Sequence, residues 1–221
     1  DQTTEYIIVS NFNSPTSIEE EIYSEEQFKM IERSSINQIN LNSNCLNLLF
    51  VGRLVNFKGV DLIMEIARKL KDNNRVTFTI IGDGPERESL TKFKEKYKLK
   101  NVNLLGPIYD RKKIVNAYKK CDVVMLLSQK REGFSIAISD ALVFGKPIII
   151  STNAYNSEFN GFDLGFIEKD NDIDTICNDI KQLQFNSKTY EMKSVGAIRF
   201  AKKFLDINKN LRILREVING K

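Results

Sequence analysis

The sequence VVMLLSQKREGFSIAISDALVFG, at residues 123–145, contains the signals that decide the fold of this chain. Its first five residues are apolar, which is the length and pattern of a buried strand. From Ile136 onward apolar residues recur at helical spacing, and Gly145 is a stop signal for a helix. The stretch therefore predicts a strand, a turn and a helix, in that order.

The turn between this strand and helix is a candidate anion site. Ligands of open parallel sheets bind at the carboxyl ends of strands, and the N–H groups at a helix start favour negative charge. Glu132 and Asp140 are eight residues apart, so they point the same way if both lie near the helix face. Carboxylates beside an anion site suit a ligand that also carries hydroxyls, such as a nucleotide sugar. The alternative is an ordinary turn with solvated acids.

The rest of the chain repeats this alternation of strand and helix. Further apolar segments predict strands at residues 46–51, 75–81, 101–105, 146–151 and 164–167. Amphipathic segments predict helices at residues 60–70, 85–97, 110–120, 172–183, 190–204 and 206–218. Strands that are apolar throughout belong to a parallel sheet covered on both faces. We therefore predict an α/β fold, a doubly wound parallel Rossmann-like sheet of roughly six strands with carboxyl-terminal helices.

The first 44 residues read differently from the rest. They contain a strand candidate at residues 6–10 and a helix candidate at residues 18–31, and they end in a stretch rich in Asn and Ser. We interpret residues 1–44 as a lead-in or interdomain connection, and residues 45–221 as one Rossmann-like domain with terminal helices.

Composition excludes several kinds of chemistry. The 221 residues include no histidine, which removes Ser-His-Asp triads and His-ligated metal sites. The three cysteines lie far apart without a CxxC pair, so neither a zinc site nor a disulfide framework is indicated. A net charge of +4 without a long Lys/Arg run gives no case for nucleic acid as a partner. It fits anionic small molecules or a weak preference for membrane surfaces.

A second strand-to-helix turn carries positive charge. Residues 52–59, GRLVNFKG, follow the first predicted strand of the sheet. We expect Gly52 to let the backbone turn tightly, and Arg53 and Lys58 to place two cations where an anion would bind. The alternative is a solvated basic loop. The turn is not a Walker A loop and has no GxGxxG, so nucleotide binding by those routes is unsupported.

Together these motifs resemble the family-4 retaining glycosyltransferases, and specifically the carboxyl-terminal, donor-binding domain of their GT-B fold. The resemblance covers residues 47–165 and rests on five motifs that occur in the family's order. They are Gly52-Arg53 with Lys58-Gly59, IIGDGP at residues 80–85, residues 102–106, Glu132-Gly133-Phe134 with a second acid at Asp140, and GKPI at residues 145–148.

The resemblance implies a role for each matching charged side chain. Arg53 and Lys58, beside Gly52, would hold the donor's diphosphate and stabilise it as a leaving group. Glu132 would contact hydroxyls of the donor sugar. Arg53, Lys58 and Glu132 are therefore the candidate catalytic residues.

Backbone groups and one further acid would complete the donor site. The N–H groups of Gly133, Phe134 and Ser135 would meet phosphate and sugar, and the backbone near Ile108 would hold the base. Asp140 would bind the ribose hydroxyls. The family's pattern usually has Glu at this position, so the ribose contact is the role most affected by the departure.

The resemblance also implies a reaction. The donor would be a UDP- or GDP-sugar, from which a hexose would pass to a glycan or a lipid-linked acceptor, as in polysaccharide biosynthesis at the cell envelope. No metal or other cofactor is implied, because Arg53 and Lys58 take the place of the cation. We expect a cytoplasmic enzyme, or one that is peripheral at the inner face of a membrane through the full-length protein.

Two departures keep other interpretations open. Residues 1–44 are too short for the family's amino-terminal acceptor domain, so we expect an enzyme half that transfers nothing alone. Residues 151–155, STNAY, replace a glycine-rich turn that often faces the sugar. With Asp140, this change favours a non-catalytic nucleotide-binding module. A doubly wound domain with an unrelated ligand is a third interpretation, against which the co-occurrence of Arg53, Lys58 and Glu132 argues.

Overall fold

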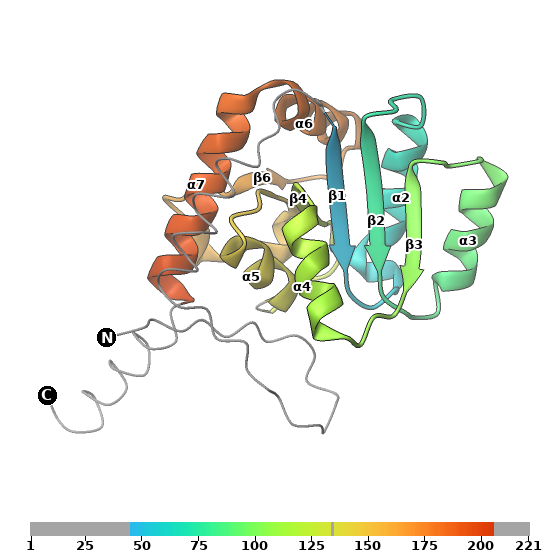
Figure 1. Cartoon of the computed structure of the whole chain (residues 1–221), viewed down its shortest axis with the longest axis horizontal. Helices are drawn as coiled ribbons and strands as arrows, with labels where there is room; N and C mark the ends of the chain where they lie inside the picture. The colour runs from blue at the N-terminus through green and yellow to red at the C-terminus, as the bar shows by residue number, and fades with distance from the viewer. Residues whose placement is uncertain (1–44, 134, 206–221) are drawn as a thin grey trace, which may run out of the picture.

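Six apolar segments of the chain pair into one parallel sheet. The computed structural model describes residues 45–133 and 135–205. Its strands run side by side in the order β3-β2-β1-β4-β5-β6 (Figure 1), and every neighbouring pair is parallel. The strands are β1 (Leu46–Val51), β2 (Val76–Ile81), β3 (Val102–Gly106), β4 (Val123–Leu126), β5 (Ile148–Ser151) and β6 (Gly165–Glu168).

The direction in which the strands are added reverses between β1 and β4. The chain moves outward from β1 through β2 to β3, returns across the sheet to β4, and continues outward through β5 to β6. β1 and β4 are paired through Leu48 with Val123 and Leu49 with Val124. The loops that leave their carboxyl ends lead to opposite faces of the sheet. This position is the topological switch point, where ligands bind in doubly wound sheets.

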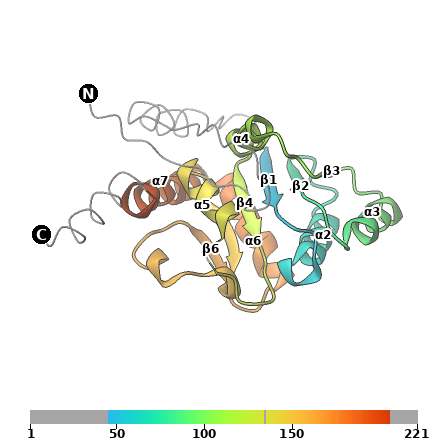
Figure 2. The ribbon, with the colours of Figure 1, turned by 90° about the horizontal axis from the view of Figure 1, so that it is seen from below.

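Helices cover both faces of the sheet (Figure 2). One face carries α2 (Val60–Lys69), α3 (Arg87–Lys96) and α6 (Ile173–Phe185), and the other carries α4 (Arg111–Lys120), α5 (Ile136–Val143) and α7 (Ser187–Phe204). The loops after β1 and β5 contain the 3-10 helices η1 (Asn56–Lys58), η2 (Thr152–Ala154) and η3 (Ser157–Phe159). Within residues 45–133 and 135–205, no helix has the length and apolar character needed to cross a membrane.

Apolar spacing and caps explain why these helices form and dock. In α2 the buried positions Val60, Ile63, Met64 and Ala67 recur every three or four residues, which gives the helix one apolar stripe against the sheet. Asp110 caps α4, because its side chain accepts hydrogen bonds from two N–H groups of the first turn. β4 is buried along its whole length, as expected for a central strand covered on both faces.

The predicted architecture is confirmed. Each predicted strand is present with ends within two residues of those expected, and helices cover both faces. α7 begins three residues before the predicted start, because the Asn186 side chain accepts from the Thr189 amide and caps the helix at Ser187. The predictions made for residues 1–44 and 206–218 lie outside the described residues.

Candidate functional site

The loops that follow β1, β4 and β5 meet at the carboxyl edge of the sheet. The amide of Gln129, after β4, donates to the carbonyl oxygen of Phe57, after β1, at 2.7 Å. The amide of Glu132 donates to the carbonyl oxygen of Asn153, after β5, at 2.8 Å. These bonds pair backbone groups that lie outside the sheet ladders. The switch point is therefore lined by three loops in a fixed arrangement.

Gly59 lets the first of these loops pack directly on the end of β4. Its φ angle is 70°, in the left-handed region that favours glycine. A Cβ atom at this position would lie 2.0 Å from the carbonyl oxygen of Leu127. No side chain fits there without moving backbone. The close approach places the neighbouring Lys58 opposite the loop that follows β4.

The backbone bends at Gly52, as expected, but this bend does not require a glycine. Gly52 does not have a positive φ angle, and an added Cβ would meet the Phe50 ring at 3.4 Å, an ordinary contact. The position that requires glycine is Gly82, with a φ angle of 153°, because a Cβ there would lie 1.8 Å from the Gly52 carbonyl oxygen. The loop after β2 thus supports the turn after β1, and the Gly52 amide completes the contact by donating to Ile81 at 3.0 Å.

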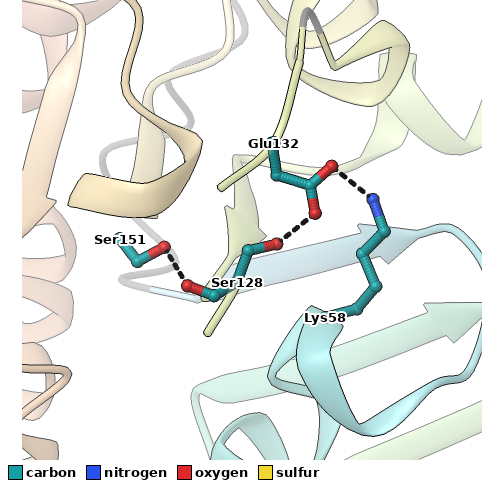
Figure 3. Close-up of polar contacts among 4 residues, drawn as sticks. All are labelled: Lys58, Ser128, Glu132 and Ser151. Carbon is teal, nitrogen blue, oxygen red and sulfur yellow. Dashed lines mark hydrogen bonds and ion pairs between the residues drawn. The ribbon is translucent and has the colours of Figure 1, made fainter. Parts of the chain in front are cut away.

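Lys58 and Glu132 meet across the switch point (Figure 3). The Lys58 Nζ is 2.6 Å from Oε2 of Glu132, and the two side chains are 21% and 11% exposed. The other carboxylate oxygen, Oε1, accepts a hydrogen bond of 2.5 Å from the Ser128 hydroxyl. The structure therefore brings together two of the three candidate catalytic residues, which lie 74 positions apart in the chain. Arg53, the third, is exposed on the same loop as Lys58.

Asp140 and Glu132 do not share a helix face, so the condition under which they would point the same way is not met. α5 begins at Ile136, and Glu132 lies before it in the loop. Asp140 is in the helix and 3% exposed. Burial raises the pKa of its carboxyl well above the usual range, and the nearby Arg111 guanidinium opposes this shift. Burial, and to a lesser extent the charge of Asp140, raises the pKa of Tyr118 on α4. Its proposed contact with a ribose stays a prediction.

The remaining predicted donor contacts lie along the same edge of the sheet. A Cβ added at Gly133 would meet no atom of residues 45–133 and 135–205 within 4 Å, so among these residues the backbone borders open space. Ser135 is the N-cap residue of α5 and makes no capping bond with its side chain. Ile108 is partly buried in the loop after β3, which is two strands from β1. Phe134 lies outside the described residues.

Three polar residues of the site were not predicted as functional. Ser128 is fully buried, and its carbonyl oxygen accepts from the Ser151 hydroxyl at 2.7 Å and from the Asn153 side-chain amide at 3.1 Å. In the sequence, residues 151–155 are distinguished only by their departure from a glycine-rich turn. The available signal was their position, because each lies at or within two residues of the end of an apolar strand at the ligand edge.

The arrangement offers charges of both signs to a ligand. Lys58 and Arg53 suit a phosphate group, and Glu132 suits hydroxyl donors. In the described ranges, no three Cys, Asp or Glu side chains form a group that could hold a metal ion. A doubly wound sheet with such groups at its switch point defines a Rossmann-like domain.

The chain belongs to the family described as glycosyl transferases group 1, whose model matches residues 32–202. An uncharacterized glycosyltransferase of Methanocaldococcus jannaschii is 26% identical over 180 residues, which are 79% of this chain and 45% of that protein. The chain spans less than half the length of the first curated relatives it matches.

Solved structures share the fold. The carboxyl-terminal domain of a glycosyl transferase group 1 family protein from Francisella tularensis has a TM-score of 0.66 at 21% identity, with 73% of this chain and 87% of that domain covered. HepE of Anabaena, crystallised with UDP, has a TM-score of 0.69 at 19% identity, with 90% of this chain and 57% of HepE covered.

Proposed function

We propose that this chain is the carboxyl-terminal, donor-binding domain of a retaining family-4 glycosyltransferase with the GT-B fold. The full-length enzyme transfers a hexose from a nucleoside-diphosphate sugar to a glycan or a lipid-linked acceptor, and an amino-terminal domain holds that acceptor. The observation that carries the proposal is the Lys58–Glu132 pair at the switch point, with Arg53 exposed beside it. One side of the pair is chemically suited to phosphate, and the other to sugar hydroxyls.

In the proposed reaction, the domain stabilises the leaving group. The bond between the anomeric carbon and the diphosphate oxygen breaks, and its electron pair goes to the diphosphate. Arg53 and Lys58 neutralise the charge that develops there, so no metal ion is required. The acceptor oxygen attacks from the side of the leaving group, and its proton passes to the departing phosphate. Glu132 orients the sugar, and Gly52, Gly133, Phe134, Ser135, Asp140 and the backbone near Ile108 complete the donor site.

The solved relatives favour a uridine nucleotide as the first donor to test. HepE of Anabaena has been crystallised with UDP and with UDP-glucose, and TarM of Staphylococcus aureus with UDP. A GDP-sugar is the second candidate. The place of action that we propose is the cytoplasm, or the inner face of a membrane with which the full-length protein associates, and the product is a cell-envelope polysaccharide.

One observation favours a second function, that of a non-catalytic nucleotide-binding module. Asp140 is 3% exposed and its carboxyl has a pKa raised by burial, so the side chain is poorly placed to offer a charged carboxylate to a ribose. A module of this kind binds the diphosphate through Arg53 and Lys58 and gains nothing from a sugar.

A thermal-shift panel tests the donor assignment. The ligands are UDP, GDP and ADP, each alone and as its glucose ester, with UDP-N-acetylglucosamine and GDP-mannose added. A ligand that binds only the folded state raises Tm, and we expect one nucleotide with its sugar ester to exceed the rest. Release of nucleoside diphosphate by the full-length protein, with that donor and cell-envelope fractions as acceptor, then tests for an enzyme. Nucleotide binding without sugar preference or turnover would support the module.

A further inference from the structure

Ser128 lies in the loop that follows β4 and is buried where this loop contacts the loop that follows β5. Its side chain donates a hydrogen bond, and its backbone carbonyl oxygen accepts two. The hydroxyl donates to Oε1 of Glu132 at 2.5 Å, and the carbonyl oxygen accepts from Ser151 and Asn153 (Figure 3 shows the Ser151 bond). The backbone of Asn153 in turn accepts the Glu132 amide at 2.8 Å. Glu132 is thus fixed at both its backbone and its carboxylate by the same small group of residues.

The two partners of the Glu132 carboxylate differ in what a ligand does to them. Lys58 contacts Oε2, and its positive charge makes it the partner that an arriving diphosphate attracts. Ser128 contacts Oε1, carries no charge and is 0% exposed, so a phosphate has no access to it. A hydroxyl-to-carboxylate bond of 2.5 Å lies in the range of charge-assisted hydrogen bonds. The Ser128 bond can therefore remain when the Lys58 bond is shared or broken.

We propose that Ser128, held by Ser151 and Asn153, is a positioning residue that keeps Glu132 directed at the donor sugar while Lys58 binds the diphosphate. The inference rests on the proposed function, because it gives the two ends of the Lys58–Glu132 pair to two parts of one donor. It also assigns a purpose to the polar residues at 151–155. Ser151 and Asn153 donate to the Ser128 carbonyl oxygen, and the Asn153 carbonyl oxygen accepts the Glu132 amide, so both ends of the loop segment from Ser128 to Glu132 are fixed.

The test is whether the sugar part of the donor contributes to affinity. Calorimetry measures Kd for UDP and UDP-glucose, UDP and UDP-N-acetylglucosamine, GDP and GDP-mannose, and ADP and ADP-glucose. We select the pair for which the wild-type chain shows the largest preference for the sugar ester over the free nucleotide. Both members of this pair are then titrated into Ser128→Ala. We expect Kd for the free nucleotide to change less than twofold, and the preference for the sugar ester to fall by about tenfold, the scale of a hydrogen bond to a charged group.

Ser194→Ala is the matched control. Ser194 is 2% exposed, and its hydroxyl donates to the Gly145 carbonyl oxygen at 2.7 Å, away from Glu132. This variant removes a buried serine hydroxyl of similar kind and should keep the wild-type preference. Ser128→Thr retains a hydroxyl and should restore the preference in part. If circular dichroism shows Ser128→Ala to be unfolded, Ser151→Ala serves instead and should reduce the preference in the same direction.

The outcomes separate this inference from the proposed function. A wild-type chain that prefers a sugar ester, with Ser128→Ala showing the same preference, overturns the role of Ser128 alone. A wild-type chain that binds free nucleotides and sugar esters equally overturns both the role of Ser128 and a sugar-contacting Glu132, and supports the nucleotide-binding module. A wild-type chain that binds none of the ligands overturns the donor-binding function and this inference with it.

Discussion

The Lys58 ammonium is 2.6 Å from the Glu132 carboxylate and both side chains are largely buried, so a ligand at this site meets an ion pair that is already formed. The pair holds two long side chains in place before binding, which lowers the entropy lost when the ligand arrives. A diphosphate must therefore interact with Lys58 more strongly than the Glu132 carboxylate does in order to compete with it. An anion with two phosphate groups, assisted by Arg53, meets that requirement better than a single carboxylate.

Replacement of Lys58 tests the diphosphate assignment at the level of one side chain. We expect Lys58→Ala to weaken binding of UDP or GDP by about ten- to hundredfold, because charge-assisted hydrogen bonds contribute on this scale. Arg53→Ala should act in the same direction, and the double variant should lose less than the sum, since both residues serve one ligand. The measurement is isothermal titration calorimetry on the full-length protein, in which the cleft is closed.

Lys92→Ala is the control for Lys58→Ala. Lys92 also lies 2.6 Å from a glutamate, Glu88, but this pair is exposed on α3. Its loss should leave nucleotide binding unchanged. Wild-type affinity in both Arg53→Ala and Lys58→Ala would show that the diphosphate binds elsewhere.

At the scale of the elements, the loop after β1 is fixed by a glycine that contacts backbone. We expect Gly59→Ala to lower the free energy of unfolding by about 2 kcal/mol or more, because it combines a left-handed φ angle with a clash against the Leu127 carbonyl. Gly161→Ala separates these two causes. Gly161 has a φ angle of 80°, and no atom of the described part of the chain lies within 4 Å of an added Cβ, so we expect only the backbone strain of about 1 kcal/mol. Urea unfolding of both variants checks the prediction, and equal losses would contradict it.

The packing of β6 against α6 buries two carboxyl groups side by side. Glu168 at the end of β6 is hydrogen-bonded to Asp179 of α6, and burial together with this neighbour raises the pKa of Glu168 to about 8. The pKa of Asp179 is also raised by burial, with Lys193 of α7 opposing the shift. Lys193 donates to Asp163 at 2.8 Å and to the Gly165 carbonyl oxygen at 2.9 Å.

This pair predicts the direction in which stability changes with pH. The folded state holds a proton on Glu168 that the unfolded state releases near pH 4.5, so stability is full below that pH and falls as pH rises toward about 8. Glu168→Gln keeps a hydrogen-bond donor without titrating and should flatten this decline. Glu158→Gln, an exposed glutamate of η3, is the matched control. Urea unfolding at pH 5 and pH 8 measures both, and an unchanged decline in Glu168→Gln would refute the prediction.

The sequence predicts the strands and helices of this fold better than it predicts the contacts among the site residues. Apolar runs such as Val123–Leu127 specify buried strands, and the rule that ligands bind beyond strand ends correctly brings Lys58 near Glu132. Periodicity does not give the residue at which a helix begins. For this reason α7 was expected to begin at residue 190 and begins instead at Ser187. The bonds of Ser128 join loops that are distant in sequence, and no local pattern predicts such contacts.

At the scale of the whole molecule, the chain holds all the donor contacts that we propose and spans less than half the length of its first curated relatives. Where one wall of a cleft is missing, bound phosphates stay hydrated and their ion pairs contribute little. Transfer further requires an acceptor held within reach of the anomeric carbon, and such positioning supplies much of the rate.

We therefore expect these 221 residues alone to fold, to bind nucleotide weakly and to transfer no sugar. Circular dichroism, calorimetry and a coupled assay for nucleoside-diphosphate release check the three parts. The comparison is the full-length protein, which should bind more tightly and turn over. Sugar transfer by the 221 residues alone, abolished by Glu132→Ala, would make Glu132 catalytic in its own right and remove the need for a second domain.

The contact between Gly59 and Leu127 has a consequence for how such a site can diverge during evolution. Residue 59 need not touch a ligand, yet almost any mutation there has to be accompanied by a change in the loop of its neighbour. The reverse holds for Gly133, because a side chain added there meets no atom of the described residues within 4 Å. We therefore expect substitutions to be tolerated more readily at residue 133 than at residue 59 in descendants of this sequence.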